Sequence, residues 1–344
     1  MVEESCTWIK RQVTKRRRSN QSSTGVSPVS FSIHSNHGRD ARATGFPAVA
    51  SSQLRVPSEW SLDKNGVGSR SFREPTLFHF PSDFDWTGFT ISFIDSTTHP
   101  RFGLGYAALW DEFGDKGEME QRAVIEQRMA WMPERPIARH AMLYEMVVVM
   151  RDDELAAVRD HTAIVDLANP DEPVTVHLSH LLIMPRYRGN GLAGWMRAMP
   201  IRTARECLSR AKQAPRPITL VAEMEPADAA YPDRFKRLVA YEKVGFVKVD
   251  PSTIHYLQPD FRAPPVIDAA GGPHPIPLSL VVRRVKREDE TSVQGREVKT
   301  IVESLYTMYG QSFREQDMTP NWASLATYPP DATTIALVPP SRIG

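Results

Sequence analysis

One stretch constrains the fold most: an apolar run that ends at Pro185 and resumes at helical spacing beyond a glycine-rich turn. Gly189 and Gly191 let the backbone approach a ligand closely, and the N–H groups in the first turn of a new helix point at such a ligand. Arg188 adds a forked cationic donor that suits phosphate oxygens. The stretch therefore predicts a strand, an anion-binding loop and a helix start, with a diphosphate as the ligand.

Other nucleotide-binding loops fit this stretch less well. A P-loop needs Lys followed by Ser or Thr after its second glycine, and this chain lacks both there. Gly189, Gly191 and Gly194 do match the Gly-x-Gly-x-x-Gly pattern of dinucleotide-binding folds. However, Pro185 separates the apolar run from the first glycine, and Glu223 lies further from Gly194 than the usual distance of about 20 residues. The dinucleotide hypothesis stays open as the weaker alternative.

The segments around the loop predict a mixed fold. Residues 143–150 and 155–165 flank a turn cluster and predict a hairpin, and residues 174–183 predict a third strand. We expect the sheet to be antiparallel up to this point. Beyond the loop, apolar positions recur at helical spacing as far as Ala211, with Pro200 expected to kink the helix or to mark a restart.

A strand, helix and strand crossover is expected around the loop. Its second strand is predicted at residues 218–224, and a further helix at 232–243 is closed by Gly245. The remaining expected elements are a first strand at 89–95, one or two helices at 104–132, and closing strands at 253–257 and 278–285.

The loop resembles a known motif. Residues 183–193 look like the acyl-CoA pyrophosphate loop of the GNAT superfamily of N-acetyltransferases, in which Arg or Gln is followed by two residues, Gly, one residue, and Gly or Ala. Arg188, Gly191 and Ala193 match that pattern.

A second motif strengthens the resemblance. Tyr241, Gly245 and Phe246 match the family's Tyr-x-x-x-Gly-Phe signature, which precedes its next strand. The family often has an Asn earlier on this helix, whereas this chain has none at 233–235. The resemblance covers roughly residues 86–287. It implies an α/β (α+β) fold with a mixed, mostly antiparallel central sheet flanked by helices.

The resemblance also implies a cofactor site that binds acetyl-CoA as co-substrate. The residues expected to hold the pyrophosphate are Arg188, Gly189, Asn190, Gly191, Leu192 and Ala193. In the family, two parallel strands splay beside this loop and leave backbone groups free for the thioester and pantetheine. Here those groups would belong to Leu182, Ile183 and Met184.

Direct acetyl transfer to an amine needs a base, donors for the oxyanion, and an acid for the departing thiolate. His177 precedes Arg188 by the spacing at which some enzymes that this chain resembles place their base, and an imidazole suits neutral pH. Glu223, on the neighbouring predicted strand, is the competing base. Tyr241 occupies the family's general-acid position. The choice between the two bases stays open, and so does a purely structural role for each of the three.

A metal site is not expected. His177 and His180 lie three residues apart in a predicted strand, so their side chains should point to opposite faces. The chain has no His-Glu-x-x-His, no paired Cys spacing and no Gly-x-Ser-x-Gly elbow. Cys6 falls in the predicted tail and Cys207 on a predicted helix, so we expect no structural disulfide.

The predicted organisation has three parts. Residues 1–75 hold twice as many Lys and Arg as Asp and Glu and little apolar periodicity, which predicts a disordered, basic, low-complexity tail. Its basic cluster lacks interleaved aromatics, so no nucleic-acid partner is expected. Residues 76–290 should form the GNAT-like domain, and residues 291–344 a C-terminal helix followed by a Pro-rich tail. Self-association of that helix into a homodimer stays open.

The sequence therefore predicts an N-acetyltransferase that moves an acetyl group from acetyl-CoA directly to a primary amine of a small molecule or peptide. The acceptor is expected to contact residues 110–113 and 131–134, whose aromatic and acidic side chains suit a cationic amine. No apolar segment reaches the length of a membrane span, so no membrane partner and a cytoplasmic location are expected. The alternative is a non-catalytic acyl-CoA sensor or partner-binding module.

Overall fold

A mixed sheet organises residues 87–343, which are the residues that the computed structural model describes. The predicted basic tail lies outside them. The strands lie in the order β1 (Phe89–Ile94), β2 (His140–Arg151), β3 (Glu154–Asp166), β4 (Val174–Ile183), β5 (Ile218–Met224), β8 (Ile276–Arg284), β6 (Val247–Val249), β10 (Thr334–Val338) and β9 (Ser292–Gln294), and β7 (Tyr256–Gln258) pairs with β8. Among the described strands only β4 and β5 pair in parallel. The predicted fold class, with its antiparallel first half and single crossover, is confirmed.

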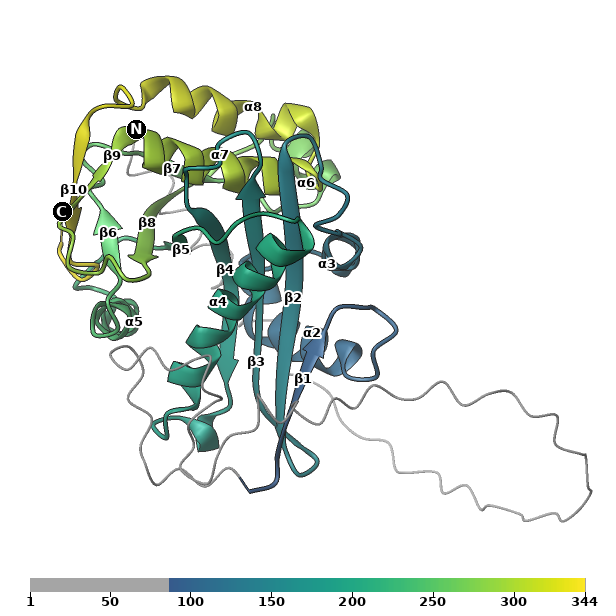
Figure 1. The fold of residues 1–344 in the computed structure, drawn as a ribbon. Coiled ribbons are helices and arrows are strands. Elements are labelled where there is room, and N and C mark those ends of the chain that lie inside the picture. The colour runs from purple at the N-terminus through teal and green to yellow at the C-terminus, as the bar shows by residue number, and fades with distance from the viewer. Residues whose placement is uncertain (1–86, 344) are drawn as a thin grey trace, which may run out of the picture. The chain divides into compact units, whose positions relative to one another are not determined.

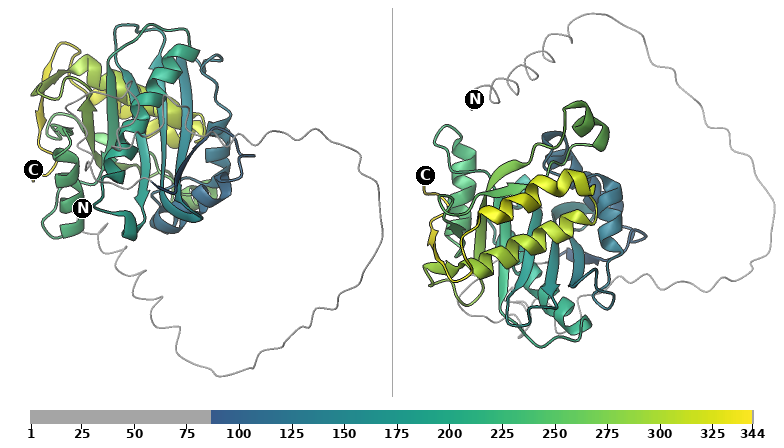
Figure 2. Two further views of the ribbon diagram at one scale, coloured as in Figure 1. Left: turned by 60° about the horizontal axis from the view of Figure 1, so that its bottom comes forward. Right: turned by 90° about the horizontal axis from the view of Figure 1, so that it is seen from above.

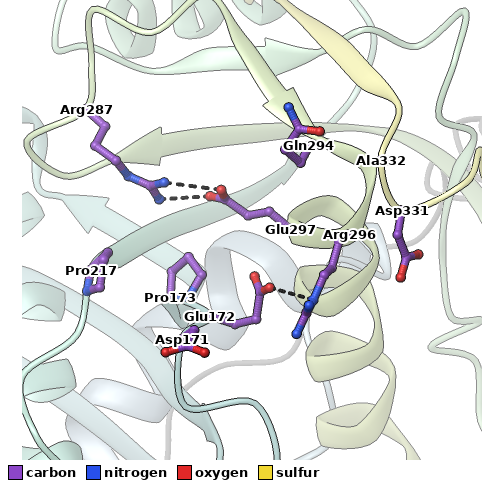
Figure 3. A pocket seen from close by; sticks show the side chains of 10 residues that line it. All are labelled: Asp171, Glu172, Pro173, Pro217, Arg287, Gln294, Arg296, Glu297, Asp331 and Ala332. Carbon is purple, nitrogen blue, oxygen red and sulfur yellow. Dashed lines mark hydrogen bonds and ion pairs between the residues drawn. The ribbon is translucent and has the colours of Figure 1, made fainter.

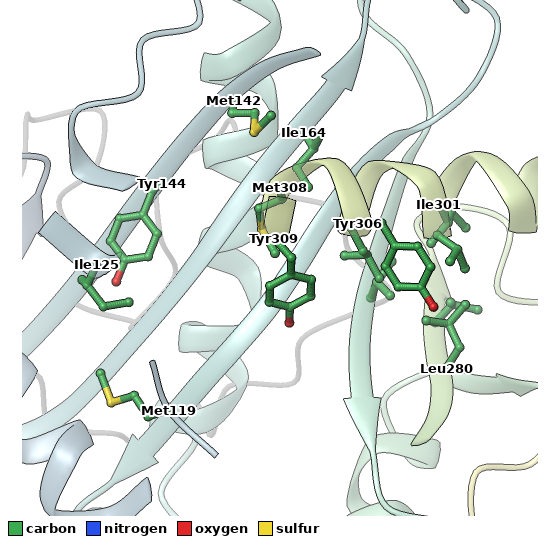
Figure 4. Close-up of a cluster of buried hydrophobic side chains, with 14 of the residues drawn as sticks. Met119, Ile125, Met142, Tyr144, Ile164, Leu280, Ile301, Tyr306, Met308 and Tyr309 are labelled. Atoms are coloured by element: carbon green, nitrogen blue, oxygen red, sulfur yellow. The ribbon is translucent and has the colours of Figure 1, made fainter. Parts of the chain in front are cut away.

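Helices cover both sides of this sheet (Figures 1 and 2). The helices are α2 (Phe102–Phe113), α3 (Arg122–Met129), α4 (Leu192–Arg210), α5 (Pro232–Glu242), α6 (Pro264–Ala269), α7 (Gly295–Gly310) and α8 (Glu315–Ser324). Side chains of α4 and α5 pack with one face of the sheet, which we call the α4 face. Side chains of α2, α3 and α7 pack with the other, the α7 face, and Figure 4 shows part of that cluster.

β4 contains a bulge that changes which face its side chains occupy. The register with β3 passes from the pair Thr162–His177 to the pair Asp160–His180, so β4 has one residue more than β3 between these pairs. Such an extra residue is a β-bulge, and it interrupts the alternation of the side chains. As a result His180 returns to the face that His177 occupies.

Two ring contacts show this shared face. The His177 ring lies 5.6 Å from the ring of Tyr309 on α7, and the His180 ring lies 5.0 Å from that of Phe113 on α2. Both partners belong to the α7-face cluster or pack against it. The prediction that the two histidines point to opposite faces is therefore wrong, because it assumed an unbroken strand.

β4 and β5 stay paired over only part of their length. The parallel ladder ends at the pair His177–Val221, although β4 continues to Ile183 and β5 to Met224. Backbone groups of residues 178–183 that face β5 therefore have no ladder partner on that strand. The divergence that the family resemblance implied is present, and it begins directly after a predicted catalytic residue.

α4 runs unbroken from Leu192 to Arg210 although Pro200 lies inside it. Proline has no N–H to bond the carbonyl of residue i−4, which here is Met196. Nη1 of Arg159, from β3, donates to that carbonyl oxygen at 3.4 Å. A guanidinium from the sheet thus stands in for the missing amide, and the helix does not restart.

The C-terminal residues contribute more structure than the sequence indicated. The C-terminal helix expected within residues 291–344 is α7, and it is preceded by β9 and followed by α8 and β10. β10 pairs antiparallel with both β6 and β9, so it belongs to the sheet. Its pairing partners lie far away along the chain, which is why the Pro-rich composition did not reveal a strand. The proposed domain boundaries at residues 75 and 290 stay predictions.

A buried ion pair on the α7 face should make stability depend on pH. Burial alone would lower the pKa of His180, but the charge and hydrogen bond of Asp160 raise it to about 9. Such a group stabilises fully below its unfolded pKa near 6.5 and loses its contribution as pH rises through the folded value. We expect His180→Gln to lower the free energy of unfolding in urea by roughly 1–3 kcal/mol at pH 6 and by clearly less at pH 9.5.

At low pH the stability depends on Asp160, the ion-pair partner of His180. Burial opposes ionisation of Asp160, yet His180 and the hydroxyl of Tyr144 hold its pKa at about 2. Its contribution is present above the unfolded pKa near 3.9 and is lost as pH falls toward 2. If the difference between wild type and His180→Gln were the same at pH 6 and pH 9.5, His180 would not carry the charge assigned to it.

Candidate active site

The loop before α4 has the geometry of an anion site. Gly189 and Gly191 have φ angles of 82° and 91°, in the left-handed region that favours glycine. The amides of Gly189, Asn190, Gly191 and Ala193 donate to no described residue. Arg188 and Gly189 are exposed, so the loop lies at the surface. Free amides at a helix N-terminus, open to solvent, can bind phosphate oxygens.

The loop is fixed to the end of β4. Nε of Arg188 donates to the carbonyl oxygen of Ile183 at 2.9 Å, which leaves the outer nitrogens of the guanidinium directed away from that bond. The amide of Met184 donates to the carbonyl of Ala156 on β3. Because N–H directions alternate along a strand, the amide of Ile183 faces the divergence from β5, while those of Leu182 and Met184 face β3. Of the three predicted backbone donors, Ile183 is the one whose N–H faces the side of β4 that β5 leaves unpaired.

On the α7 face, Glu223 is the acceptor for four side chains. Nε2 of His177 lies 2.9 Å from its Oε2, the Tyr309 hydroxyl donates at 2.5 Å, Nε2 of Gln258 donates at 3.1 Å, and the Tyr256 hydroxyl donates to Oε1. Burial alone would raise the pKa of this carboxyl, but the bonds from His177 and the two tyrosines lower it overall. Glu223 is therefore a buried carboxylate, held ionised by its donors.

This arrangement fixes the tautomer of His177. A carboxylate only accepts hydrogen bonds, so the Nε2 that faces Glu223 must carry the proton. The lone pair then lies on Nδ1, which is 3.1 Å from the hydroxyl oxygen of Ser179. His177 is 4% exposed, whereas Ser179, in the bulge, is half-buried. The basic nitrogen thus reaches the region of strand divergence through a serine hydroxyl.

Tyr241 lies on the other side of the sheet. It is half-buried on α5, its ring packs edge-on against Phe246 at 4.9 Å, and both belong to the α4-face cluster or pack against it. Its hydroxyl bonds no described residue. The structure therefore brings His177 and Glu223 into one hydrogen-bonded pair and leaves Tyr241 out of contact with them, across the divergent strands.

Several site residues were not found from the sequence. Tyr309 comes from α7, Tyr256 and Gln258 from β7, and Ser179 from the bulge. The proximity of Ser179 to His177 was visible, but the bulge that directs its hydroxyl to Nδ1 was not. Tyr309 showed only the spacing of an amphipathic helix, which is the usual sign of core packing.

The residues expected to contact an acceptor divide into two groups. Phe113 and Trp131 pack in or against the α7-face core. Asp111 and Glu112 are exposed, and Glu112 pairs with Lys116 at 2.7 Å. An acceptor role for this region stays a prediction.

The described residues were also examined for a reactive cysteine thiol, a metal-binding group and a membrane-spanning helix. Burial raises the pKa of the Cys207 thiol to about 12, so it is protonated and packed rather than nucleophilic. No group of three or more His, Cys, Asp and Glu in residues 87–343 could hold a metal ion. No described helix is both long and apolar enough for a membrane span.

A separate pocket lies between the β3–β4 connection and the start of α7 (Figure 3). Its volume is about 440 Å³, within the range of small-molecule sites. Both of its arginines are paired with glutamates of the lining, Arg296 with Glu172 at 2.9 Å and Arg287 with Glu297 at 2.8 Å. None of the predicted site residues lines it, so it is not the candidate site.

Comparison with known proteins gives similarity in structure alone. No protein-family model matches the chain, and neither does any curated protein. The chain is similar to an acetyltransferase from Streptococcus agalactiae, with 11% identity, a TM-score of 0.33, and coverage of 58% of this chain and 99% of that one. It is also similar to yncA from Salmonella typhimurium, whose structure is described as that of an acetyltransferase with acetyl-CoA, with 18% identity, a TM-score of 0.28, and coverage of 58% and 94%.

A third similarity involves a longer protein. It is the GCN5-related glucosamine N-acetyltransferase region of a fungal multi-domain GH3 beta-N-acetylglucosaminidase, with 16% identity, a TM-score of 0.33, and coverage of 70% of this chain and 24% of that one.

The Glu223 network predicts unequal effects of two tyrosine substitutions on α7. Tyr309→Phe removes a donor to a buried carboxylate, and hydrogen bonds to charged groups contribute about 1.5–3 kcal/mol. Tyr306→Phe is the matched control, because its hydroxyl donates to the neutral carbonyl of Leu257, a bond of about 0.5–1.5 kcal/mol. Urea unfolding at pH 7 should show the larger loss for Tyr309→Phe. A larger loss for Tyr306→Phe would contradict a charged Glu223.

Proposed function

We propose that this chain is a GNAT-type acyltransferase that moves an acetyl group from acetyl-CoA directly to a primary amine of a small molecule or peptide. The observation that carries the proposal is the stretch of β4 without a ladder partner on β5, residues 178–183. One end of it meets the anion-binding loop, and the other meets the His177–Glu223 pair. At about 3.3 Å per residue the stretch spans roughly 15–20 Å, which is the scale of an extended pantetheine arm.

The chain's residues fit acetyl-CoA at three points. The free amides of Gly189, Asn190, Gly191 and Ala193 and the Arg188 guanidinium suit the pyrophosphate. The unpaired edge of β4 suits the amide groups of the pantetheine arm, because it can form hydrogen bonds with them as it would with an added strand. The amide of Ile183, at the loop end of that edge, suits the arm, whereas N–H groups of the same edge nearer to His177 suit the thioester oxygen.

Proton removal from the amine would follow the bonds around His177. As the amine attacks the thioester carbon, Ser179 takes a proton from it and passes its own hydroxyl proton to Nδ1 of His177. Glu223 stabilises the resulting imidazolium through Nε2. This route joins the two bases that the sequence left as alternatives: His177 accepts the proton, and Glu223 orients and stabilises it.

A second candidate is a non-catalytic module that binds acyl-CoA. The observation that favours it is burial, since the side chains of His177 and Glu223 are 5% and 3% exposed beneath Tyr309. Release of CoA in the presence of a panel of primary amines distinguishes the two candidates, because a sensor would bind acetyl-CoA without turnover.

Charge reversal in the loop tests the cofactor site. Arg188→Glu should weaken acetyl-CoA binding in calorimetry by roughly tenfold to hundredfold, the equivalent of one charge-assisted hydrogen bond. Arg210→Glu, at the opposite end of α4, makes the same charge change away from the loop and should leave the affinity unchanged. Equal affinities for wild type and Arg188→Glu would remove the assignment of the loop.

Substitutions of residues on the proposed proton route should reduce turnover without weakening acetyl-CoA binding. We expect His177→Gln to reduce kcat by about 10²–10⁴-fold, with acetyl-CoA affinity close to that of wild type. Ser179→Ala should reduce kcat to a smaller extent, because a water molecule can take the place of the hydroxyl between the amine and Nδ1. Thr175→Ser, on the same face of β4 but outside the network, is the control. Unchanged kcat in both site variants would refute the route.

A further inference from the structure

Ser179, His177 and Glu223 form one hydrogen-bonded chain of side chains. Oγ of Ser179 lies 3.1 Å from Nδ1 of His177, and Nε2 of the same ring lies 2.9 Å from Oε2 of Glu223. A hydroxyl nucleophile, an imidazole base and a carboxylate that orients the base are the three parts of a serine hydrolase site. Such a site is defined by geometry and not by sequence position, so it does not require a Gly-x-Ser-x-Gly elbow.

The protons in this chain lie where a nucleophilic serine needs them. Since Glu223 only accepts, Nε2 of His177 holds the ring proton, and the lone pair of Nδ1 faces the Ser179 hydroxyl. In the chymotrypsin arrangement the two ring nitrogens are exchanged, with the carboxylate on Nδ1 and the serine on Nε2. The neutral ring offers one donor and one acceptor in either orientation, so the exchange leaves its function as a base intact.

Glu223 can stabilise a positive charge on the ring. Burial alone would raise the pKa of Glu223, but hydrogen bonds from His177, Tyr256 and Tyr309 lower it overall. The carboxylate is therefore charged and held in place by several donors. An imidazolium that forms when His177 takes the serine proton would have a fixed counter-charge at Nε2.

Ser179 is the member of the chain that a substrate can reach. It is half-buried, whereas the side chains of His177 and Glu223 are 5% and 3% exposed. It also lies in the bulge, at the start of the stretch of β4 that has no ladder partner on β5. Because N–H directions alternate along a strand, the amide of Leu181 faces the same unpaired side as that of Ile183. An N–H two residues from the nucleophile can stabilise the oxyanion that forms during attack.

The geometry points to a second activity: when no amine is bound, Ser179, His177 and Glu223 hydrolyse the acyl thioester through an acyl-serine intermediate. The choice of acetyl-CoA as the substrate rests on the proposed function. The serine chemistry itself can be tested without a coenzyme. The same hydrogen bond that lets Ser179 relay a proton from an amine also makes its oxygen nucleophilic.

The reaction has two balanced steps. In the first, Oγ of Ser179 bonds to the acyl carbon and its proton moves to Nδ1 of His177. The C–S bond breaks with its electron pair on sulfur, and the proton from Nδ1 gives free CoA. In the second, a water oxygen bonds to the acyl carbon and its proton moves to Nδ1. The C–Oγ bond then breaks, and Oγ takes that proton back, which releases acetic acid.

A phosphonofluoridate probe, which phosphonylates activated serine hydroxyls, tests the nucleophile without any coenzyme. Mass spectrometry of the full chain and of its peptides should locate a single adduct on Ser179. Glu223→Gln, which removes the charge behind His177, should slow the labelling by at least about hundredfold. Ser209→Ala removes an exposed serine of α4 and is the matched control, with the labelling of wild type.

Hydrolysis of acetyl-CoA without any amine tests the activity itself. Release of the CoA thiol is followed with a chromogenic thiol reagent, with and without a panel of primary amines. Ser179→Ala should reduce the amine-independent rate by at least about hundredfold and the amine-dependent rate by less. A water molecule can relay a proton in place of the hydroxyl, but it cannot form an acyl-serine.

The outcomes separate this activity from the proposed function. If the probe labels Ser179 but acetyl-CoA neither binds nor reacts, the proposed function fails and the activated serine remains. If acetyl-CoA binds and Ser179 stays unlabelled, the second activity is overturned while the acyl-CoA site remains. Equal amine-independent hydrolysis by wild type and Ser179→Ala would overturn it as well.

Discussion

The separation of β4 from β5 after the pair His177–Val221 is the constraint on which the rest of the candidate site depends. Backbone polar groups need partners, so a stretch of strand without a ladder neighbour must be satisfied by water or by a ligand. The bulge in β4 lies just beyond the last pair and places the hydroxyl of Ser179 against His177. At its other end the same stretch leads to the loop that begins α4.

Charged groups of opposite sign lie on the two faces of the sheet beside the divergence. On the α7 face, Glu223 is a carboxylate held by four donors. On the α4 face, Arg159 has no carboxylate partner among the described residues. If these groups shared a face they would pair and neutralise each other.

The C-terminal residues contact the candidate site and complete the sheet. Tyr309 extends from α7 to Glu223, and β10 ties the chain back into the sheet beside β6. The hydroxyl of Tyr306, one turn earlier, bonds β7 through Leu257 and so helps to hold the strand that carries Tyr256 and Gln258. A segment that the sequence presented as a helix and a tail therefore completes the surroundings of Glu223.

The sequence alone determined the elements from β2 to α5 and the loop between β4 and α4, because helix and strand periodicity, Gly189 and Gly191, and the order of apolar runs are short-range signals. It also named His177 and Glu223, although not that they form one hydrogen-bonded pair. Only the tertiary structure decided the shared face of His177 and His180, the role of Tyr309, and the isolation of Arg159. Those features depend on one extra residue in β4 and on contacts between segments distant in the chain, which no local pattern encodes.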